Sequence, residues 1–172
     1  MRNRLFWTVL LGLAACGEQG EQYEGSVAAL GAPVALGEQL VFVRKPDHSA
    51  LYVSPESLED GQVEHVELPA GPMAVVPRKG EGAEALVLCE GRRGDRDHEA
   101  VPAALAVIDA DAGQRRYGLI NPFQAIHQSK DGRYAVLLKS TQSGRLLDNP
   151  LEIAIVDLDE AGDDGVTLRT LA

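Results

Sequence analysis

The chain has 172 residues, of which 26 are acidic and 16 are basic, and its formal net charge at pH 7 is −10. This charge disfavours nucleic acid and anionic lipid surfaces as partners, because both repel an acidic protein. The length is sufficient for one domain with a hydrophobic core.

The N-terminus has the three zones of a secretory signal. Arg2 and Arg4 form a basic start, residues 5–13 are almost wholly apolar, and the small residues Ala14 and Ala15 follow. The apolar zone is shorter than the roughly 20 residues that a bilayer span needs. A buried core helix is the alternative, and the basic start and small-residue end favour the signal.

The residues Leu-Ala-Ala-Cys at 13–16 resemble the lipobox of bacterial lipoproteins. In that family the cysteine receives a diacylglycerol, the signal is cut before it, and the new amine is acylated, often with palmitate. The resemblance implies a signal peptide at 1–15 and Cys16 anchored in the lipid bilayer. Gly17, where an inner-membrane lipoprotein has Asp, implies the outer membrane of the bacterial cell envelope. A plain secretory signal with a free Cys16 is the alternative.

Residues 16–37 are rich in Gly, Glu, Gln and Ala, and are expected to form a flexible tether after the lipidated cysteine. A short helix around residues 27–30 is a further expectation. The folded domain is predicted to cover residues 38–172.

From Gln39 onward, short apolar runs alternate with turn residues. This spacing is typical of the strands of an all-β protein. The expected strands lie at 39–45, 50–54, 62–69, 73–77, 84–89, 104–110, 114–120, 123–128, 134–140, 151–158 and 165–171.

Cys89 ends the apolar run 85–89 and is predicted to be a small buried side chain in a strand. If Cys16 carries lipid, Cys89 has no partner for an intramolecular disulfide. A reactive thiol and an intermolecular disulfide are the alternatives.

Comparison of the chain with itself indicates an internal repeat. Residues 75–88 align without a gap on residues 125–138, and residues 105–111 align on residues 153–159. The offsets are 50 and 48 residues. The pairs Asp131-Gly132 and Glu81-Gly82 fall where a tight hairpin turn needs a positive φ angle.

The repeat resembles the blades of YVTN-type, lactonase-like β-propellers. Residues 130–136 (Lys-Asp-Gly-Arg-Tyr-Ala-Val) are similar to their Pro-Asp-Gly-Arg hairpin, and residues 106–113 are similar to their Val-Ile-Asp segment. The resemblance implies antiparallel four-stranded blades, about 2.5–3 in this chain. Because a closed propeller takes four to eight blades, the ring is incomplete. A piece of a longer protein is the favoured explanation, and ring closure by further copies or a different antiparallel sheet are the alternatives.

The connections between the second and third strands of each blade are expected to lie on one face of the molecule and to lengthen along the chain, at 45–49, 90–102 and 140–150. Long loops on a rigid scaffold are common binding sites. The candidate residues on this loop face, for a ligand or a protein partner, are Arg92, Arg93, Asp95, Arg96, Asp97, His98, Asn121, Arg145 and Asp148. Two solvated, charged loops without a ligand are the alternative.

No catalytic residue, metal site or cofactor can be assigned from the motifs, because no nucleophile elbow, phosphate loop or paired histidine motif is present. The aspartates at 109, 111, 157 and 159 are interpreted as turn residues of the blades. The sequence therefore predicts a membrane-anchored lipoprotein acting as a propeller-like binding or scaffold module. The alternatives are a fragment of a propeller hydrolase or lactonase with its catalytic residues elsewhere, and a structural envelope protein without a ligand.

Overall fold

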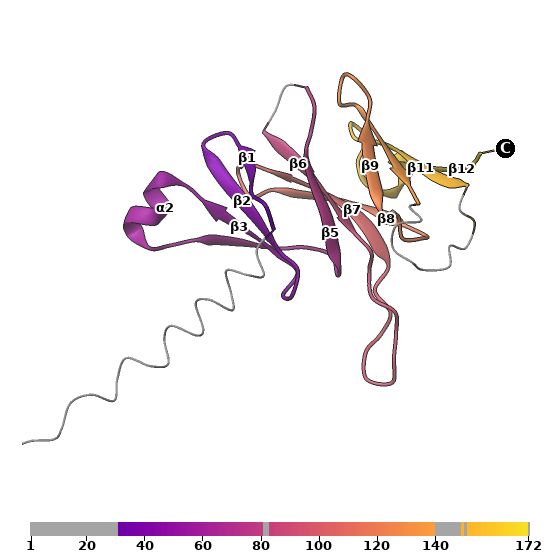
Figure 1. Cartoon of the computed structure of the whole chain (residues 1–172), viewed down its shortest axis with the longest axis horizontal. Helices are drawn as coiled ribbons and strands as arrows, with labels where there is room; N and C mark the ends of the chain where they lie inside the picture. The colour runs from indigo at the N-terminus through magenta and orange to yellow at the C-terminus, as the bar shows by residue number, and fades with distance from the viewer. Residues whose placement is uncertain (1–30, 81–82, 140–148, 150, 172) are drawn as a thin grey trace, which may run out of the picture.

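The computed structural model describes residues 31–80, 83–139, 149 and 151–171, and these fold into three antiparallel sheets of four strands each (Figure 1). Sheet 1 comprises β1 (Val34–Leu36), β2 (Gln39–Arg44), β3 (Ser49–Val53) and β4 (Glu64–Glu67). Sheet 2 comprises β5 (Pro72–Pro77), β6 (Glu84–Cys89), β7 (Ala103–Asp109) and β8 (Gln114–Leu119). Sheet 3 comprises β9 (Ala125–Gln128), β10 (Tyr134–Leu138), β11 (Glu152–Asp157) and β12 (Val166–Thr170).

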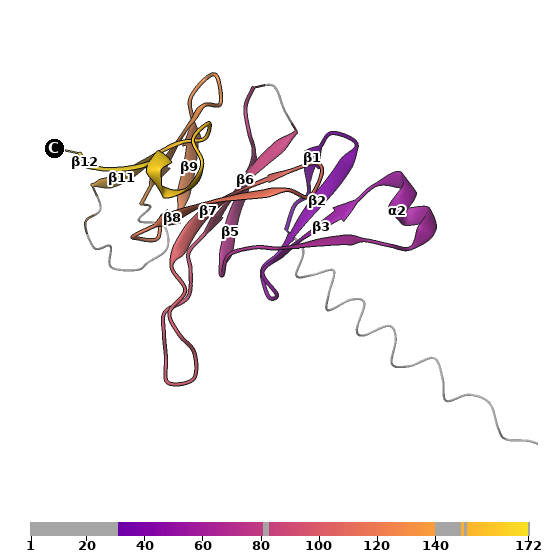
Figure 2. The same cartoon turned by 180° about the vertical axis from the view of Figure 1, so that it is seen from behind.

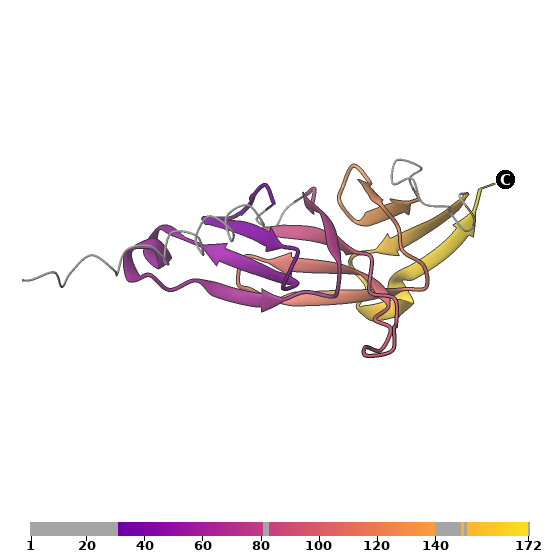
Figure 3. The ribbon, with the colours of Figure 1, turned by 60° about the horizontal axis from the view of Figure 1, so that its bottom comes forward.

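Within each sheet the strands follow the order of the chain, and the three sheets succeed one another along the molecule (Figure 3). Among the first strands, β1 lies against β5 and β5 lies against β9, as the inner strands of neighbouring propeller blades do. The all-β, propeller-like fold predicted from the repeat is confirmed, with three four-stranded blades. The part of the chain that the structure describes forms no closed ring.

Two segments differ from the sequence prediction. Residues 34–36, expected to belong to the tether, form β1 and complete sheet 1, because Val34 and Leu36 bury their side chains against sheet 2. Residues 55–60 form the short helix α2, which was not predicted. A capping box between Ser54 and Ser57 starts this helix, and Gly61, with a φ of 67°, ends it. The signal peptide, Cys16 and the helix expected at 27–30 lie outside the described residues.

The repeat is confirmed, but its gapless alignment is wrong by one residue in the first strand of the blade. In sheet 2, Val75 pairs with Val87, whereas in sheet 3 it is Ile126 that pairs with Leu137. The offset is therefore 51 in the first strand and 50 in the second. The turn between β9 and β10 is one residue shorter than the turn between β5 and β6, and this accounts for the difference.

Sheet 2 is buried on both faces, because successive side chains of a strand point to opposite sides. Ala85 and Val87 of β6 pack in the cluster shared with sheet 1, and Leu86 and Leu88 pack in the cluster shared with sheet 3. We call the contact of sheets 1 and 2 the first junction and that of sheets 2 and 3 the second junction. Cys89 is fully buried in the first junction, as predicted, and burial raises the pKa of its thiol to about 12.

The hairpin turn between β9 and β10 needs its glycine. Gly132 has a φ of 74°, and a Cβ atom at this position would collide with the backbone carbonyl of Lys79. Of the pair Asp131-Gly132, for which a positive φ was predicted, Gly132 has one and Asp131 does not, whereas Glu81 and Gly82 lie outside the described residues.

The aspartates at the ends of the third strands of sheets 2 and 3 shape turns, as predicted. The Asp109 carboxylate accepts hydrogen bonds from the backbone N–H groups of Asp111 and Gly113, at 2.9 and 2.8 Å. In the same way Asp157 accepts from the N–H of Asp159, at 3.1 Å. These carboxylates therefore satisfy backbone donors of the turns.

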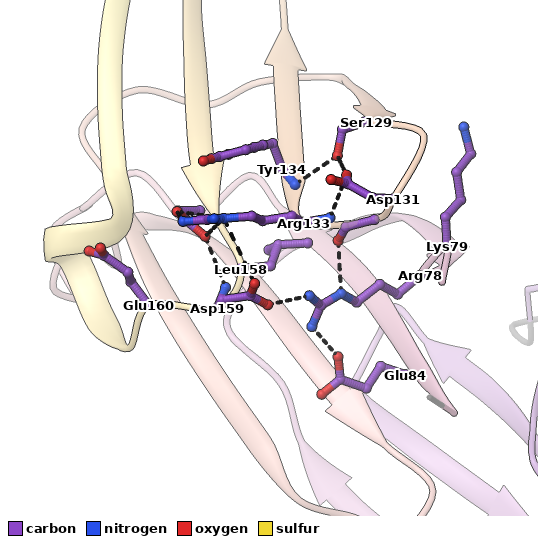
Figure 4. A network of polar contacts seen from close by, with 12 residues as sticks. Arg78, Lys79, Glu84, Ser129, Asp131, Arg133, Tyr134, Leu158, Asp159 and Glu160 are labelled. Atoms are coloured by element: carbon purple, nitrogen blue, oxygen red, sulfur yellow. Dashed lines mark hydrogen bonds and ion pairs between the residues drawn. The ribbon is translucent and has the colours of Figure 1, made fainter. Parts of the chain in front are cut away.

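A polar clasp of four side chains closes the second junction at the hairpin-turn end of the sheets, and Figure 4 shows three of them, Arg78, Glu84 and Asp159. Arg78 forms ion pairs with Glu84 at 2.6 Å and with Asp159 at 2.8 Å, and its Nε–H donates to the backbone carbonyl of Gly132. Arg115 forms a second ion pair with Glu84, at 2.6 Å. The clasp, Arg78, Glu84, Arg115 and Asp159, thereby ties sheet 2 to sheet 3.

None of the helices within the described residues is both long enough and apolar enough to cross a membrane.

Candidate ligand-binding pocket

A pocket of about 1060 Å³ lies on the loop face, where the β6–β7 connection meets the β8–β9 connection. The β6–β7 connection projects from the sheets as a long loop (Figure 2). The residues that line the pocket are Glu90, Gly91, Arg92, Arg93, Ala100, Val101, Pro102, Ala103, Ile120, Asn121, Pro122, Gln124 and Lys139.

The base of the long loop is held by backbone contacts. The N–H and C=O groups of Arg92 and Val101 bond to each other in both directions, at 2.9 and 2.8 Å. Gly91 precedes this bridge with a φ of 74°, and a Cβ atom there would collide with the carbonyl oxygen of Val101. The close approach of the two strands of the loop therefore requires a glycine.

Two exposed arginines stand on the loop side of the pocket. The guanidinium of Arg92 lies 3.5 Å from the backbone carbonyl of Glu99. Among the residues that the structure describes, no hydrogen bond or ion pair engages the guanidinium of Arg93. A planar, permanently charged guanidinium fits the two oxygens of a carboxylate or phosphate group. The arginines therefore give this wall the chemistry of an anion site.

A further lining residue, Lys139, belongs to an ion pair that is shielded from solvent. The ammonium group of Lys139 lies 2.8 Å from a carboxylate oxygen of Glu152, and their side chains are only 5% and 13% exposed. Asn121 donates a hydrogen bond to the same carboxylate at 2.9 Å, and Lys139 also lies over the ring of Phe123. These contacts fix the position of Asn121 at the pocket.

The rest of the lining is largely apolar. Ile120 is 82% exposed, and Pro102 and Pro122 are also exposed. Three basic side chains and one acidic side chain line the pocket, in a protein whose net charge is −10. The pocket is therefore suited to a ligand with an apolar body and an anionic group.

The tip of the long loop is organised by its own carboxylate. One oxygen of Asp95 accepts from the backbone N–H groups of Asp97 and His98, both at 2.9 Å, and lies 3.1 Å from the Nδ1 atom of His98. The bond from Asp97, followed by the contact with His98, lowers the pKa of the Asp95 carboxyl. This carboxylate serves the turn of the loop.

The structure brings together only some of the residues that the sequence singled out. Arg92, Arg93 and Asn121 line one pocket, although 28 residues separate Arg93 from Asn121. Asp95, Arg96, Asp97 and His98 are exposed on the loop outside the pocket lining. Arg145 and Asp148 lie outside the described residues.

Sequence reasoning missed Lys139 and Glu152, although the repeat contains a signal for both. Lys139 occupies the position of Cys89, 50 residues earlier, and Glu152 occupies the position of Ala104, 48 residues earlier. A charged pair that replaces two small side chains of the preceding blade could have been found by comparing the blades position by position.

Within the described residues, no group of three or more His, Cys, Asp or Glu side chains is placed to hold a metal ion.

No protein-family model matches the chain, and no curated protein matches it. Two solved propeller-type structures are similar to it. Kuenenia stuttgartiensis hydrazine synthase superposes with a TM-score of 0.51 and 16% identity, over 78% of this chain and 35% of that chain. A streptogramin B lyase superposes with a TM-score of 0.51 and 10% identity, over 83% of this chain and 42% of that chain. The chain spans less than half of either structure, and identities this low show a common fold alone.

Proposed function

We propose that this protein is a lipid-anchored lipoprotein of the bacterial envelope that binds an anionic ligand in the loop-face pocket. The observation that carries the proposal is the pair Arg92 and Arg93 beside Asn121, in a pocket whose other lining is mostly apolar. A protein partner could supply the same chemistry through an acidic side chain. The enzymatic alternative, a propeller hydrolase or lactonase fragment, has no residue of this pocket to which a catalytic role can be assigned.

The binding proposal is tested with a panel of carboxylates and phosphates, from inorganic phosphate to fatty acids of increasing chain length, by thermal shift and titration calorimetry. We expect longer apolar bodies to bind more tightly. The double variant Arg92→Ala/Arg93→Ala should lower the affinity at least tenfold, which corresponds to about 1.4 kcal/mol. Arg96→Ala is the matched control, because Arg96 lies on the same loop outside the pocket lining. Equal losses from Arg96→Ala and from the double variant would contradict the pocket as the binding site.

The anchor is tested separately. The intact mass of the protein extracted from membranes should equal that of residues 16–172 plus acyl chains, and Cys16→Ala should release the protein from the membrane fraction. An unmodified Cys16 in the mature protein would contradict the anchor and leave the pocket proposal standing.

A further inference from the structure

Exposed apolar side chains are concentrated at the two ends of the row of sheets. Among the described residues, six of the seven large exposed hydrophobic side chains belong to sheets 1 and 3 or their connections: Leu40, Leu58, Val63, Tyr134, Leu151 and Leu171. The seventh, Ile120, lines the pocket. These side chains therefore lie on or beside the two outer sheets, where contact with a partner would cover them.

Sheet 2 packs on sheet 3 through one of its faces. The equivalent face of sheet 3 points away from sheet 2 and carries similar apolar residues. Leu86 and Leu88 of β6 are fully buried in the second junction. Their counterparts 50 residues later, Val136 and Leu138 of β10, point away from sheet 2 and are partly exposed. Ile155, the counterpart of the buried Val107, is also partly exposed. Sheet 3 is therefore built to receive a further sheet.

Sheet 1 has an open face of the complementary kind. Val41 and Val43 of β2 are buried against sheet 2, so the alternate residues Leu40 and Phe42 point the other way. Leu40 is 45% exposed, and Phe42 is partly buried. The equivalent faces of sheets 2 and 3 each pack on the preceding sheet. In sheet 1, no other part of the described chain covers the face that carries Leu40 and Phe42.

The charges at the two ends agree with such a contact. At the second junction, Asp163, in the connection that precedes β12, accepts a hydrogen bond from the N–H of Gly118 on β8, a strand that also carries Arg115 and Arg116. The corresponding connection of sheet 1 contains helix α2 (Pro55–Asp60) with three acidic side chains. The strand that it would meet is β12, which carries the exposed Arg169.

We propose that two copies of this chain pack head to tail, with the outward face of sheet 3 of each copy on the outward face of sheet 1 of the other. Each contact repeats the arrangement of the junctions within the chain, and the two contacts are equivalent by two-fold symmetry. The result is a closed ring of six sheets, within the four to eight that propellers use. The proposal concerns assembly and is independent of the ligand pocket.

The first test measures the mass of the full chain in detergent by light scattering during size-exclusion chromatography, after subtraction of the detergent. Two copies are expected. Leu40→Asp should convert the assembly to single copies with unchanged circular dichroism, because Leu40 is exposed in the single chain. Ile120→Asp is the matched control, since Ile120 is more exposed but lies off both open faces, and it should remain paired.

The second test is cross-linking with a short bismaleimide. Leu40→Cys and Ile155→Cys are made as separate variants, one of them tagged. A mixture of the two variants should give a cross-linked product of one tagged and one untagged chain. Neither variant alone should cross-link more than the wild-type chain. The wild-type chain is the control for any reaction of Cys16. The buried Cys89 thiol, with a raised pKa, remains unreactive.

A single copy at all concentrations, open polymers, or cross-links formed by one variant alone would overturn the proposal. A native polypeptide larger than this chain, in which further sheets of the same chain cover the two faces, would also overturn it.

Discussion

The two junctions between the sheets are both built on buried apolar clusters, but they differ in polar contacts. Among the described residues, the first junction is bridged by Gln39, which donates to the carbonyl of Ala110, and by Gln114 and Arg116, which donate to the carbonyl of Glu67. The second junction has the polar clasp, and the single proton of its buried Tyr117 hydroxyl is shared between the carbonyls of Glu160 and Leu158, whose oxygens lie at 2.7 and 3.1 Å.

The difference is clearest in the buried tyrosines. The hydroxyl of Tyr52, in the first junction, has no hydrogen-bond partner among the described residues, whereas that of Tyr117 has two acceptors. Burial of apolar side chains has little directional preference, and directed polar contacts fix how two surfaces are aligned. We infer that burial holds the first junction and that burial and directed contacts together hold the second.

The largest expected effect comes from removing a buried leucine from either junction. Leu36→Ala in the first junction and Leu137→Ala in the second should each lower the free energy of unfolding by about 3 kcal/mol, through lost burial and a cavity. Chemical denaturation measures this loss, and Ile120→Ala, at a side chain that is 82% exposed and lies off both open faces, is the control. Hydrogen exchange should show that Leu36→Ala exposes the amides of β2 and β3 first. Equal loss of protection in all three sheets would contradict the distinction between the junctions.

Removal of the clasp should have the next largest effect. Arg78→Ala breaks two ion pairs and a bond to a backbone carbonyl, and we expect a loss of about 2 kcal/mol. The matched variant Arg116→Ala affects the first junction, where an exposed side chain donates to one carbonyl of sheet 1 and to the neighbouring Gln114 side chain, and it should cost less than about 0.5 kcal/mol. Thermal denaturation compares the stability of the two variants. Equal losses of stability would contradict the inference that the clasp distinguishes the second junction from the first.

A smaller effect is expected from Tyr117→Phe, which removes only a hydroxyl group. The carbonyls of Leu158 and Glu160 lose a donor, and the cost should be about 1 kcal/mol. Urea denaturation at pH 7 measures it. A neutral result would mean that solvent replaces the tyrosine hydroxyl at both carbonyls.

The smallest effect at pH 7 is expected from Tyr52→Phe, because the hydroxyl that it removes has no partner among the described residues. Its consequence lies at alkaline pH. Burial, followed by the charges of Asp109 and Glu64, raises the pKa of Tyr52 to about 12, from about 10 in an unfolded chain. The folded state therefore retains a proton that the unfolded state loses.

This linkage gives a stabilisation that is complete below pH 10 and declines as the pH rises towards 12, by about 1.4 kcal/mol per pH unit. Tyr52→Phe should remove this part of the decline when unfolding is measured between pH 8 and 12. The alkaline decline that remains is expected to come partly from Cys89, whose pKa is also raised to about 12. An unchanged slope in Tyr52→Phe would show that Tyr52 ionises equally in both states.

The blades could be predicted from the sequence because each strand is a short apolar run between turn residues, and this pattern involves only neighbouring residues. The apolar run at 85–89 predicts a strand, and the repeat places its counterpart in the next blade. That this strand is covered on both faces was learned from the structure. The prediction failed at β1, whose three residues carry too short a pattern to distinguish from a tether. The sequence comparison also missed that the repeat offset is one residue larger in the first strand than in the second. The two segments align without a gap, so the alignment does not reveal that one turn is shorter.

For the candidate site, the arginines of the long loop and Asn121 were predicted from the sequence, because the length and charge of a loop can be read without knowing the fold. Lys139 and Glu152 were overlooked, because each stands alone in the sequence near a strand end and their pairing requires β10 and β11 to lie side by side.

The sequence by itself determined the all-β character, the repeat, the turn glycine at 132 and the expectation of a lipid anchor, since each depends on neighbouring residues. Only the tertiary structure decided which face of each sheet is covered and that Arg93 shares a pocket with Asn121. It also decided that, within the described ranges, the Tyr117 hydroxyl has acceptors and the Tyr52 hydroxyl has no partner. The reason is that these properties depend on the packing of one sheet against another, which brings together residues distant in the sequence.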